Sequence, residues 1–180
     1  FKDKGYEVLL LSDPVDEVWV QSANTYKEKK LVSIGKGEIE LDKEKDEKEE
    51  EKKKEEFKNL MEFMLKELGE EVKEVRISGR LKESPACLVG SQFDMTPQMI
   101  ELMKAAGQEV PESKRILELN PLHPIVVKMQ KRHDTDSGDP VLKDFAQLLL
   151  GQAMLAEGTQ IKNPAALSQK ISMLMQRVLE

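Results

Sequence analysis

Fifteen consecutive charged residues, DKEKDEKEEEKKKEE at positions 42–56, constrain the fold of this chain more than any other feature. Nine are acidic and six are basic, so the run offers no apolar side chain to a core. A segment of this kind must lie at the surface, which makes it a natural separator between parts of a fold. Residues 1–41 precede this run, and the rest of the chain, residues 42–180, begins with it.

The charged run is typical of a disordered linker, but its spacing also suits a helix. Glu49 precedes Lys53 in the i,i+4 order that stabilises a helix by about 0.2–0.5 kcal/mol. Apolar residues then continue at helical spacing as far as Gly69. We predict one long helix over residues 44–68, with disorder as the alternative for 42–51.

The segment before the charged run predicts the end of an α/β domain. Residues 6–12, YEVLLLS, are typical of a buried strand, and Asp13 starts a helix expected to reach about Tyr26. Residues 30–34, KLVSI, predict a second strand. Two short strands and one helix cannot cover both faces of a sheet, so we expect a remnant of a larger domain and a chain that is a piece of a longer protein.

The segment after the charged run predicts an α+β fold: a small three-stranded sheet with helices, finished by a helical hairpin. The expected strands are 72–78, 86–91 and 115–119, and the expected helices are 97–107, 123–132, 141–158 and 164–180. This divides the domain into a mixed core over 70–134 and a hairpin over 140–180.

One expected helix carries a methionine-rich stripe. It begins with Thr96 as cap, ends at Gly107, and places these side chains on one side: Met95, Met99, Leu102 and Met103. Such periodicity on its own favours a core position. The alternative is an adaptable surface, because flexible, polarisable methionines suit loose binding of many partners.

The last two helices carry more apolar residues than one contact can cover. In the final helix, apolar residues form a seam at intervals of 4, 3 and 4 residues: Leu167, Ile171, Leu174 and Val178. Met175 widens this seam. The preceding helix is apolar on more than one face, through Leu142, Phe145 and Leu149 among others, and so needs more than one partner. A second copy of the chain and a purely internal helical layer both satisfy this pattern.

Residues that could carry chemistry are few. Cys87, His123 and His133 lie on three different elements without metal-ligand spacing. Cys87 is flanked by apolar residues and is interpreted as a small hydrophobe, His123 as part of a helix start, and His133 as a cation near a helix end. No phosphate-binding GxxxxGK[ST] or GxGxxG motif occurs. We predict no catalytic, cofactor-binding or metal-ligating residue, and no enzyme activity in this chain.

The composition limits the classes of partner and the cellular compartment that we expect for this chain. A net charge of −6 with five Phe, two Tyr and one Trp argues against nucleic acid as a partner. No stretch approaches the roughly 20 apolar residues that a membrane helix needs. A single cysteine excludes an intrachain disulfide, which is typical of the cytosol or an organelle matrix.

Four phrases in a fixed order, YEVLLLSDPVDE, RLKESPACLV, FDMTPQMIELMKAAG and ELNPLHPIV, carry a resemblance over essentially the whole chain. The chain resembles the ninety-kilodalton heat-shock chaperones, and their bacterial members in particular. The resemblance implies that residues 1–41 end the middle domain and that 42–180 form the C-terminal dimerisation domain. The last two helices would then join those of a second chain in a four-helix bundle.

The resemblance also implies a function: a homodimeric, ATP-driven chaperone of the bacterial cytoplasm that contacts non-native client proteins. ATP and magnesium would belong to a domain outside this chain. The implied client-contacting residues are Met95, Met99, Leu102, Met103, Glu17 and Trp19. The alternative is a purely structural dimerisation domain without client contact.

Overall fold

The computed structural model describes residues 1, 5–37, 47–91, 94–110 and 113–179. They form a mixed α+β structure that divides into two compact units. Unit 1 contains Phe1–Leu41 and Gly90–Ser113, and unit 2 contains Asp42–Val89 and Lys114–Glu180. The sequence did not anticipate that Gly90–Ser113, in the middle of the expected 70–134 core, would group with the N-terminal segment.

Unit 2 is built on the three-stranded sheet that the sequence predicts. Its strands are β3 (Val72–Ile77), β4 (Ala86–Val89) and β5 (Arg115–Leu119), in the spatial order β3-β5-β4. β5 is central, parallel to β3 and antiparallel to β4. Leu117 of β5 is fully buried and lies opposite Val75 on one side and Leu88 on the other.

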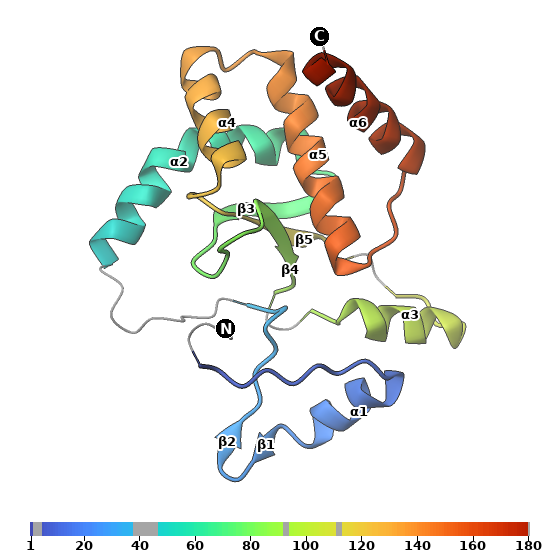
Figure 1. The fold of residues 1–180 in the computed structure, drawn as a ribbon. Coiled ribbons are helices and arrows are strands. Elements are labelled where there is room, and N and C mark those ends of the chain that lie inside the picture. The colour runs from blue at the N-terminus through green and yellow to red at the C-terminus, as the bar shows by residue number, and fades with distance from the viewer. Residues whose placement is uncertain (2–4, 38–46, 92–93, 111–112, 180) are drawn as a thin grey trace. The chain divides into compact units, whose positions relative to one another are not determined.

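Helices α2 (Glu47–Leu68), α4 (Pro124–Thr135) and α5 (Pro140–Glu157) pack around this sheet, α2 against β3 and α5 against β4 (Figure 1). The predicted long helix is confirmed from Glu47 onward, and the part of that prediction at 44–46 lies outside the described residues. Its second half, from Phe57 onward, supplies one buried face at helical spacing: Phe57, Leu60, Met64 and Leu68, all at most 3% exposed. In the preceding charged stretch, residues 51–56 are exposed except for the half-buried Lys53, as their composition requires.

Helix ends in unit 2 follow the sequence signals closely. The Nδ1 atom of His123 accepts a hydrogen bond from the Ile125 N–H at 3.2 Å, so His123 caps α4 as predicted. Asn163 caps α6 (Pro164–Leu179) in the same way, through the Ala166 N–H at 3.0 Å. Gly158 ends α5 in the left-handed conformation with φ +79°. The predicted helical hairpin of α5 and α6 is therefore confirmed.

Unit 1 holds α1 (Pro14–Ser22), the hairpin β1 (Thr25–Tyr26) and β2 (Lys29–Lys30), and α3 (Pro97–Ala105). The backbone N–H of Asp13 donates to the Asp16 carboxylate at 3.0 Å where α1 begins. Backbone hydrogen bonds of 2.9 Å join Gly90 to Gly35 and Gly37, linking the two chain stretches of the unit. α1 and α3 also contact each other.

Three sequence predictions in unit 1 are wrong. Residues 6–12 form no strand, and large apolar side chains there are exposed, including Leu10 at 90%. The helix ends at Ser22 rather than near Tyr26, and the second strand covers only Lys29–Lys30 instead of 30–34. The physical reason is that a strand needs a partner for its backbone, and an apolar run does not provide one. The predicted strand–helix–strand unit is thus a helix followed by a short hairpin.

The methionine-rich helix has the predicted caps. The Thr96 hydroxyl accepts a hydrogen bond from the Met99 N–H at 3.2 Å, and Pro97 occupies the first turn. Gly107 follows the helix with φ +75°, a conformation that glycine adopts without strain.

Candidate interaction surfaces

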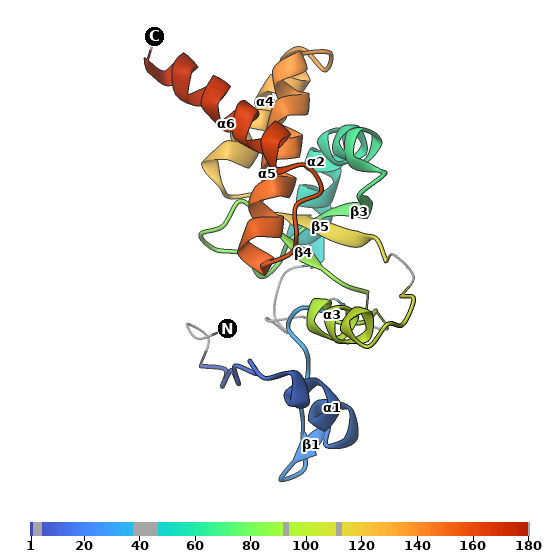
Figure 2. The ribbon, with the colours of Figure 1, turned by 90° about the vertical axis from the view of Figure 1, so that its right-hand side faces the viewer.

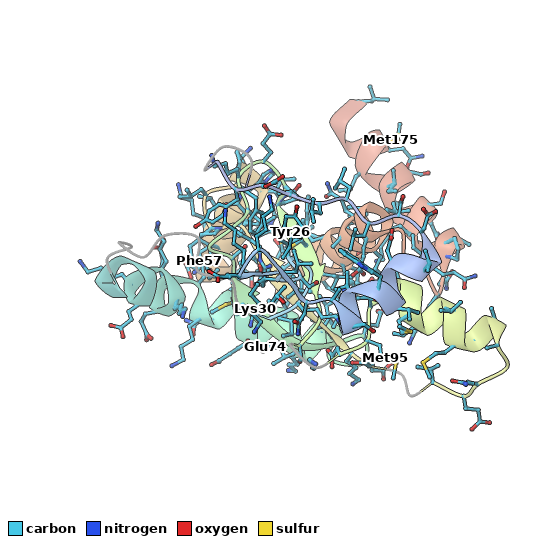
Figure 3. The ribbon with its side chains drawn as sticks, turned by 90° about the horizontal axis from the view of Figure 1, so that it is seen from below. Tyr26, Lys30, Phe57, Glu74, Met95 and Met175 are labelled. Carbon is cyan, nitrogen blue, oxygen red and sulfur yellow. The ribbon has the colours of Figure 1, made fainter. Side chains whose placement is uncertain are left out.

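The C-terminal half of α6 carries an apolar surface that unit 2 does not cover. Four residues line an open hollow of about 440 Å³: Ile171, Leu174, Met175 and Leu179. Met175 is 62% exposed and Leu179 is 87% exposed. The end of α6 stands clear of α5 in Figure 2, and Figure 3 shows Met175 on this part of the helix. We call these four residues the α6 surface.

The N-terminal half of α6 is held against α5 in the same chain. Leu167 packs over Gly151 of α5, and Lys170 forms an ion pair with Asp144. Leu167, the first member of the predicted 4-3-4 seam, thus has a partner within the chain. Ile171 and Leu174 line the open hollow, and the side chain of Val178 lies outside what the structure describes.

The α5 residues expected at a dimer interface lie deeper than the sequence suggested. Leu142 is 0% exposed and Leu149 is 3% exposed, both within the core of unit 2. Phe145 is half-buried and packs against that core. Leu142 and Leu149 therefore have no free surface to offer a second copy, because their own sheet and helices already cover them.

Exposed apolar side chains also occur in unit 1, on α1, on α3 and just before the Thr96 cap of α3. Trp19 is 46% exposed, Met95 is 40% exposed and Leu102 is 39% exposed. Met99 and Met103 are half-buried, so none of the four stripe residues belongs to the buried core. The side chain of Glu17 lies outside the described residues. We call Trp19, Met95 and Leu102 the α1–α3 surface.

Sequence reasoning missed a buried ionic cluster around Glu118 on the central strand. Its carboxylate accepts hydrogen bonds from Arg76 at 2.8 Å, from Arg80 at 2.6 Å and from the Ser78 hydroxyl at 2.9 Å. Burial alone would raise the pKa of Glu118, but the hydrogen bonds from the two guanidinium groups outweigh it and lower the pKa. Glu118, a glutamate between two leucines in the strand RILEL, was the one signal that could have found this cluster.

Cys87 on β4 lies opposite Glu118, with Sγ 3.9 Å from its Oε2. Burial, reinforced by the negative charge of Glu118, raises the pKa of the thiol to about 12. A thiol in this environment stays protonated at neutral pH, so the interpretation of Cys87 as a small hydrophobe agrees with its surroundings.

The two histidines lie at opposite ends of α4. His123 precedes α4 and caps it, whereas His133 lies in the last turn of α4 and its ring contacts that of Phe63 at 5.5 Å. Among the described residues, no three side chains of His, Cys, Asp or Glu are grouped as metal ligands. No helix within those residues is both long and apolar enough to cross a membrane.

Comparison with known proteins gives consistent matches. The family described as "Hsp90 protein" matches residues 1–180. "Chaperone protein HtpG" of Mycolicibacterium gilvum (strain PYR-GCK) is 47% identical over 169 residues, which cover 92% of this chain and 26% of the relative. The protein of the same name from Rhodococcus jostii (strain RHA1) is 45% identical over 183 residues, covering 99% and 28% respectively.

These relatives are molecular chaperones by name, and the match extends along the whole of this α+β chain. The chain belongs to the Hsp90 family of heat-shock chaperones. It spans only 26–28% of the length of the two relatives described above.

Proposed function

We propose that this chain is the dimerisation and client-contact module of a bacterial cytoplasmic heat-shock chaperone. In this proposal residues 1–41 are the end of the middle domain, and 42–180 are the C-terminal domain. ATP and magnesium would act on a part of the protein outside this chain. The observation that carries the proposal is the uncovered α6 surface at the end of an otherwise well-packed unit.

A second copy of the chain is the partner that fits the α6 surface best. All four residues that line the hollow are apolar, so an apolar partner surface is required. Two-fold symmetry supplies that surface, since each copy presents the same patch to the other. Each large apolar side chain that becomes fully buried contributes about 1.5–3 kcal/mol. α5 and α6 of two copies would then form a four-helix bundle, with the second half of α6 as its seam.

Sedimentation equilibrium tests the dimer. The chain should be dimeric at micromolar concentration, and Ile171→Asp should make it monomeric by placing an unpaired charge in the interface. Gln169→Asp is the matched control, because it adds the same charge to an exposed polar position of α6 and should leave the dimer intact. A wild-type chain that sediments as a monomer would refute the dimer.

The α1–α3 surface is the proposed contact for client proteins. Trp19, Met95 and Leu102 are exposed to similar extents within one unit, and methionine adapts to irregular apolar partners. Two copies in one dimer would add avidity without any new contact. A purely structural dimerisation domain, in which these residues bind nothing, is the alternative function.

Client binding separates the two functions. In the full-length chaperone, the double variant Met95→Ser/Leu102→Ser should suppress aggregation of a heat-unfolded test protein less well, with an almost unchanged melting temperature. Lys104→Ser removes an exposed side chain of the same helix and should keep full activity. If the double variant handles clients like the wild type, the structural alternative holds.

A further inference from the structure

Gly151 of α5 lies directly against Leu167 of α6. A Cβ atom built on Gly151 would lie 2.6 Å from Cδ1 of Leu167, 3.0 Å from its Cδ2 and 3.4 Å from its Cγ. These distances are shorter than ordinary contacts between carbon atoms. The whole end of the Leu167 side chain therefore occupies the space that any other residue at position 151 would need. We call this contact the Gly151 notch.

The notch lies in the half of α6 that is attached to its own chain. One turn further along, Lys170 pairs with Asp144 of α5. Beyond Lys170 the apolar side chains become exposed, with Ile171 at 42% and Met175 at 62%. The contacts of Leu167 and Lys170 thus set the direction in which the uncovered half of α6 extends.

We propose that Gly151 is a positioning residue for dimerisation. By admitting Leu167 against the α5 backbone, it fixes the crossing of α5 and α6 so that the α6 surface can meet the same surface of a second copy. This inference rests on the proposed dimer. Gly151 lies outside the apolar seam, yet in this proposal it controls the orientation in which that seam faces the second copy.

Alanine at position 151 makes the idea testable, because two effects then oppose each other. Alanine is a much better helix former than glycine, so without the notch Gly151→Ala would simply stabilise α5. With the notch, the end of the Leu167 side chain must move away from position 151, and in this proposal α6 shifts relative to α5 along with it. A changed α5–α6 geometry is therefore specific to the notch.

The experiment uses the 180-residue chain in a Cys87→Ser background, with spin labels at positions 156 on α5 and 176 on α6, both exposed. An excess of unlabelled chain ensures that only distances within one chain are measured. Gly151→Ala should shift this distance and raise the dimer dissociation constant about tenfold or more, the size of an overpacking effect. Gln152→Ala, at an exposed neighbouring position, should change neither quantity.

Two further variants strengthen the test. Adding Leu167→Ala to Gly151→Ala relieves the clash and should bring the distance back toward the wild-type value. If Gly151→Ala does not fold, Leu167→Ala alone empties the notch from the other helix and should broaden the distance distribution.

The outcomes separate the two proposals. A dimeric wild type whose Gly151→Ala variant keeps the same distance and the same dissociation constant would overturn the role of Gly151 alone. A monomeric wild type would overturn the dimer proposal and the role of Gly151 in it, even if the distance shifts.

Discussion

Arg80 and Glu118 form a two-point ion pair inside unit 2, with Nε donating to Oε2 at 2.8 Å and Nη2 to Oε1 at 2.6 Å. Their side chains are only 8% and 4% exposed. Arg80 follows β3 and Glu118 lies on β5, so the ion pair joins the segment after β3 to the central strand of the sheet. Arg76 and Ser78 also donate to the same carboxylate.

Replacing the Glu118 carboxylate should reduce the stability of the fold. Glu118→Gln keeps the shape of the side chain but leaves two guanidinium groups without their buried counter-charge. We expect a loss of about 3–5 kcal/mol in the free energy of unfolding, measured by urea denaturation at pH 7. Glu67→Gln is the control, because Glu67 pairs with the largely exposed Lys143 and its loss should matter much less.

The same cluster predicts an acid-sensitive stability. The folded pKa of Glu118 is lowered, so the stabilisation is complete above the unfolded value of about 4.3 and is lost as the pH falls through the folded pKa. The stability difference between wild type and Glu118→Gln should therefore narrow in acid. A difference that stays constant from pH 7 to pH 2 would contradict the ionised cluster.

Cys87 should be inert toward thiol reagents in the folded chain. With its pKa raised to about 12, the thiolate fraction at pH 8.5 is roughly a thousandfold below that of an ordinary cysteine. Alkylation by iodoacetamide, followed by mass spectrometry, should be slow until urea unfolds the chain. A cysteine introduced by Gln176→Cys, at an exposed position, should react at once and serves as the internal standard.

Substitutions in the turn between β1 and β2 should stabilise the hairpin. Lys27 and Glu28 both have positive φ, at 45° and 64°, in a two-residue hairpin turn that usually contains Asn-Gly. Replacing the pair by Asn-Gly should stabilise the hairpin by about 1–2 kcal/mol. Hydrogen exchange of the Leu31 N–H, which donates to the Asn24 carbonyl, reports this locally. Lys27→Ala/Glu28→Ala retains both Cβ atoms and should bring no such gain.

Nucleotide should not bind to this chain by itself. The sequence contains no GxxxxGK[ST] or GxGxxG phosphate-binding motif. Isothermal titration with ATP and magnesium should give only heats of dilution. Stoichiometric binding to the isolated chain would contradict this prediction and the assignment of nucleotide chemistry to another part of the protein.

Local signals in the sequence predict much of unit 2. Helix caps such as His123 and Asn163 act within a few residues of their targets, so their geometry can be read from spacing alone. The same holds for the buried face of α2, which repeats at helical intervals up to Leu68. These features require no knowledge of the rest of the fold.

The sequence could not predict which segments of the fold contact each other. Leu9 and Leu10 look like strand residues, but an apolar pattern does not supply a neighbouring strand. Leu142 was expected at a dimer interface but is fully buried within unit 2, because periodicity cannot distinguish its own core from a second copy. Glu118 meets Arg76 and Arg80 only because the chain returns to β3 after a long excursion, and no local pattern reveals that contact.

The central position of β5 has a consequence for the order of events during synthesis. β3 and β4 leave the ribosome first, but neither is hydrogen-bonded to the other, because the strand that separates them comes later in the chain. Until Arg115–Leu119 has emerged, both nascent strands have an unsatisfied edge, which invites pairing with other polypeptides. A protein of a chaperone family thus passes, while it is being made, through the kind of exposed state that calls for a chaperone.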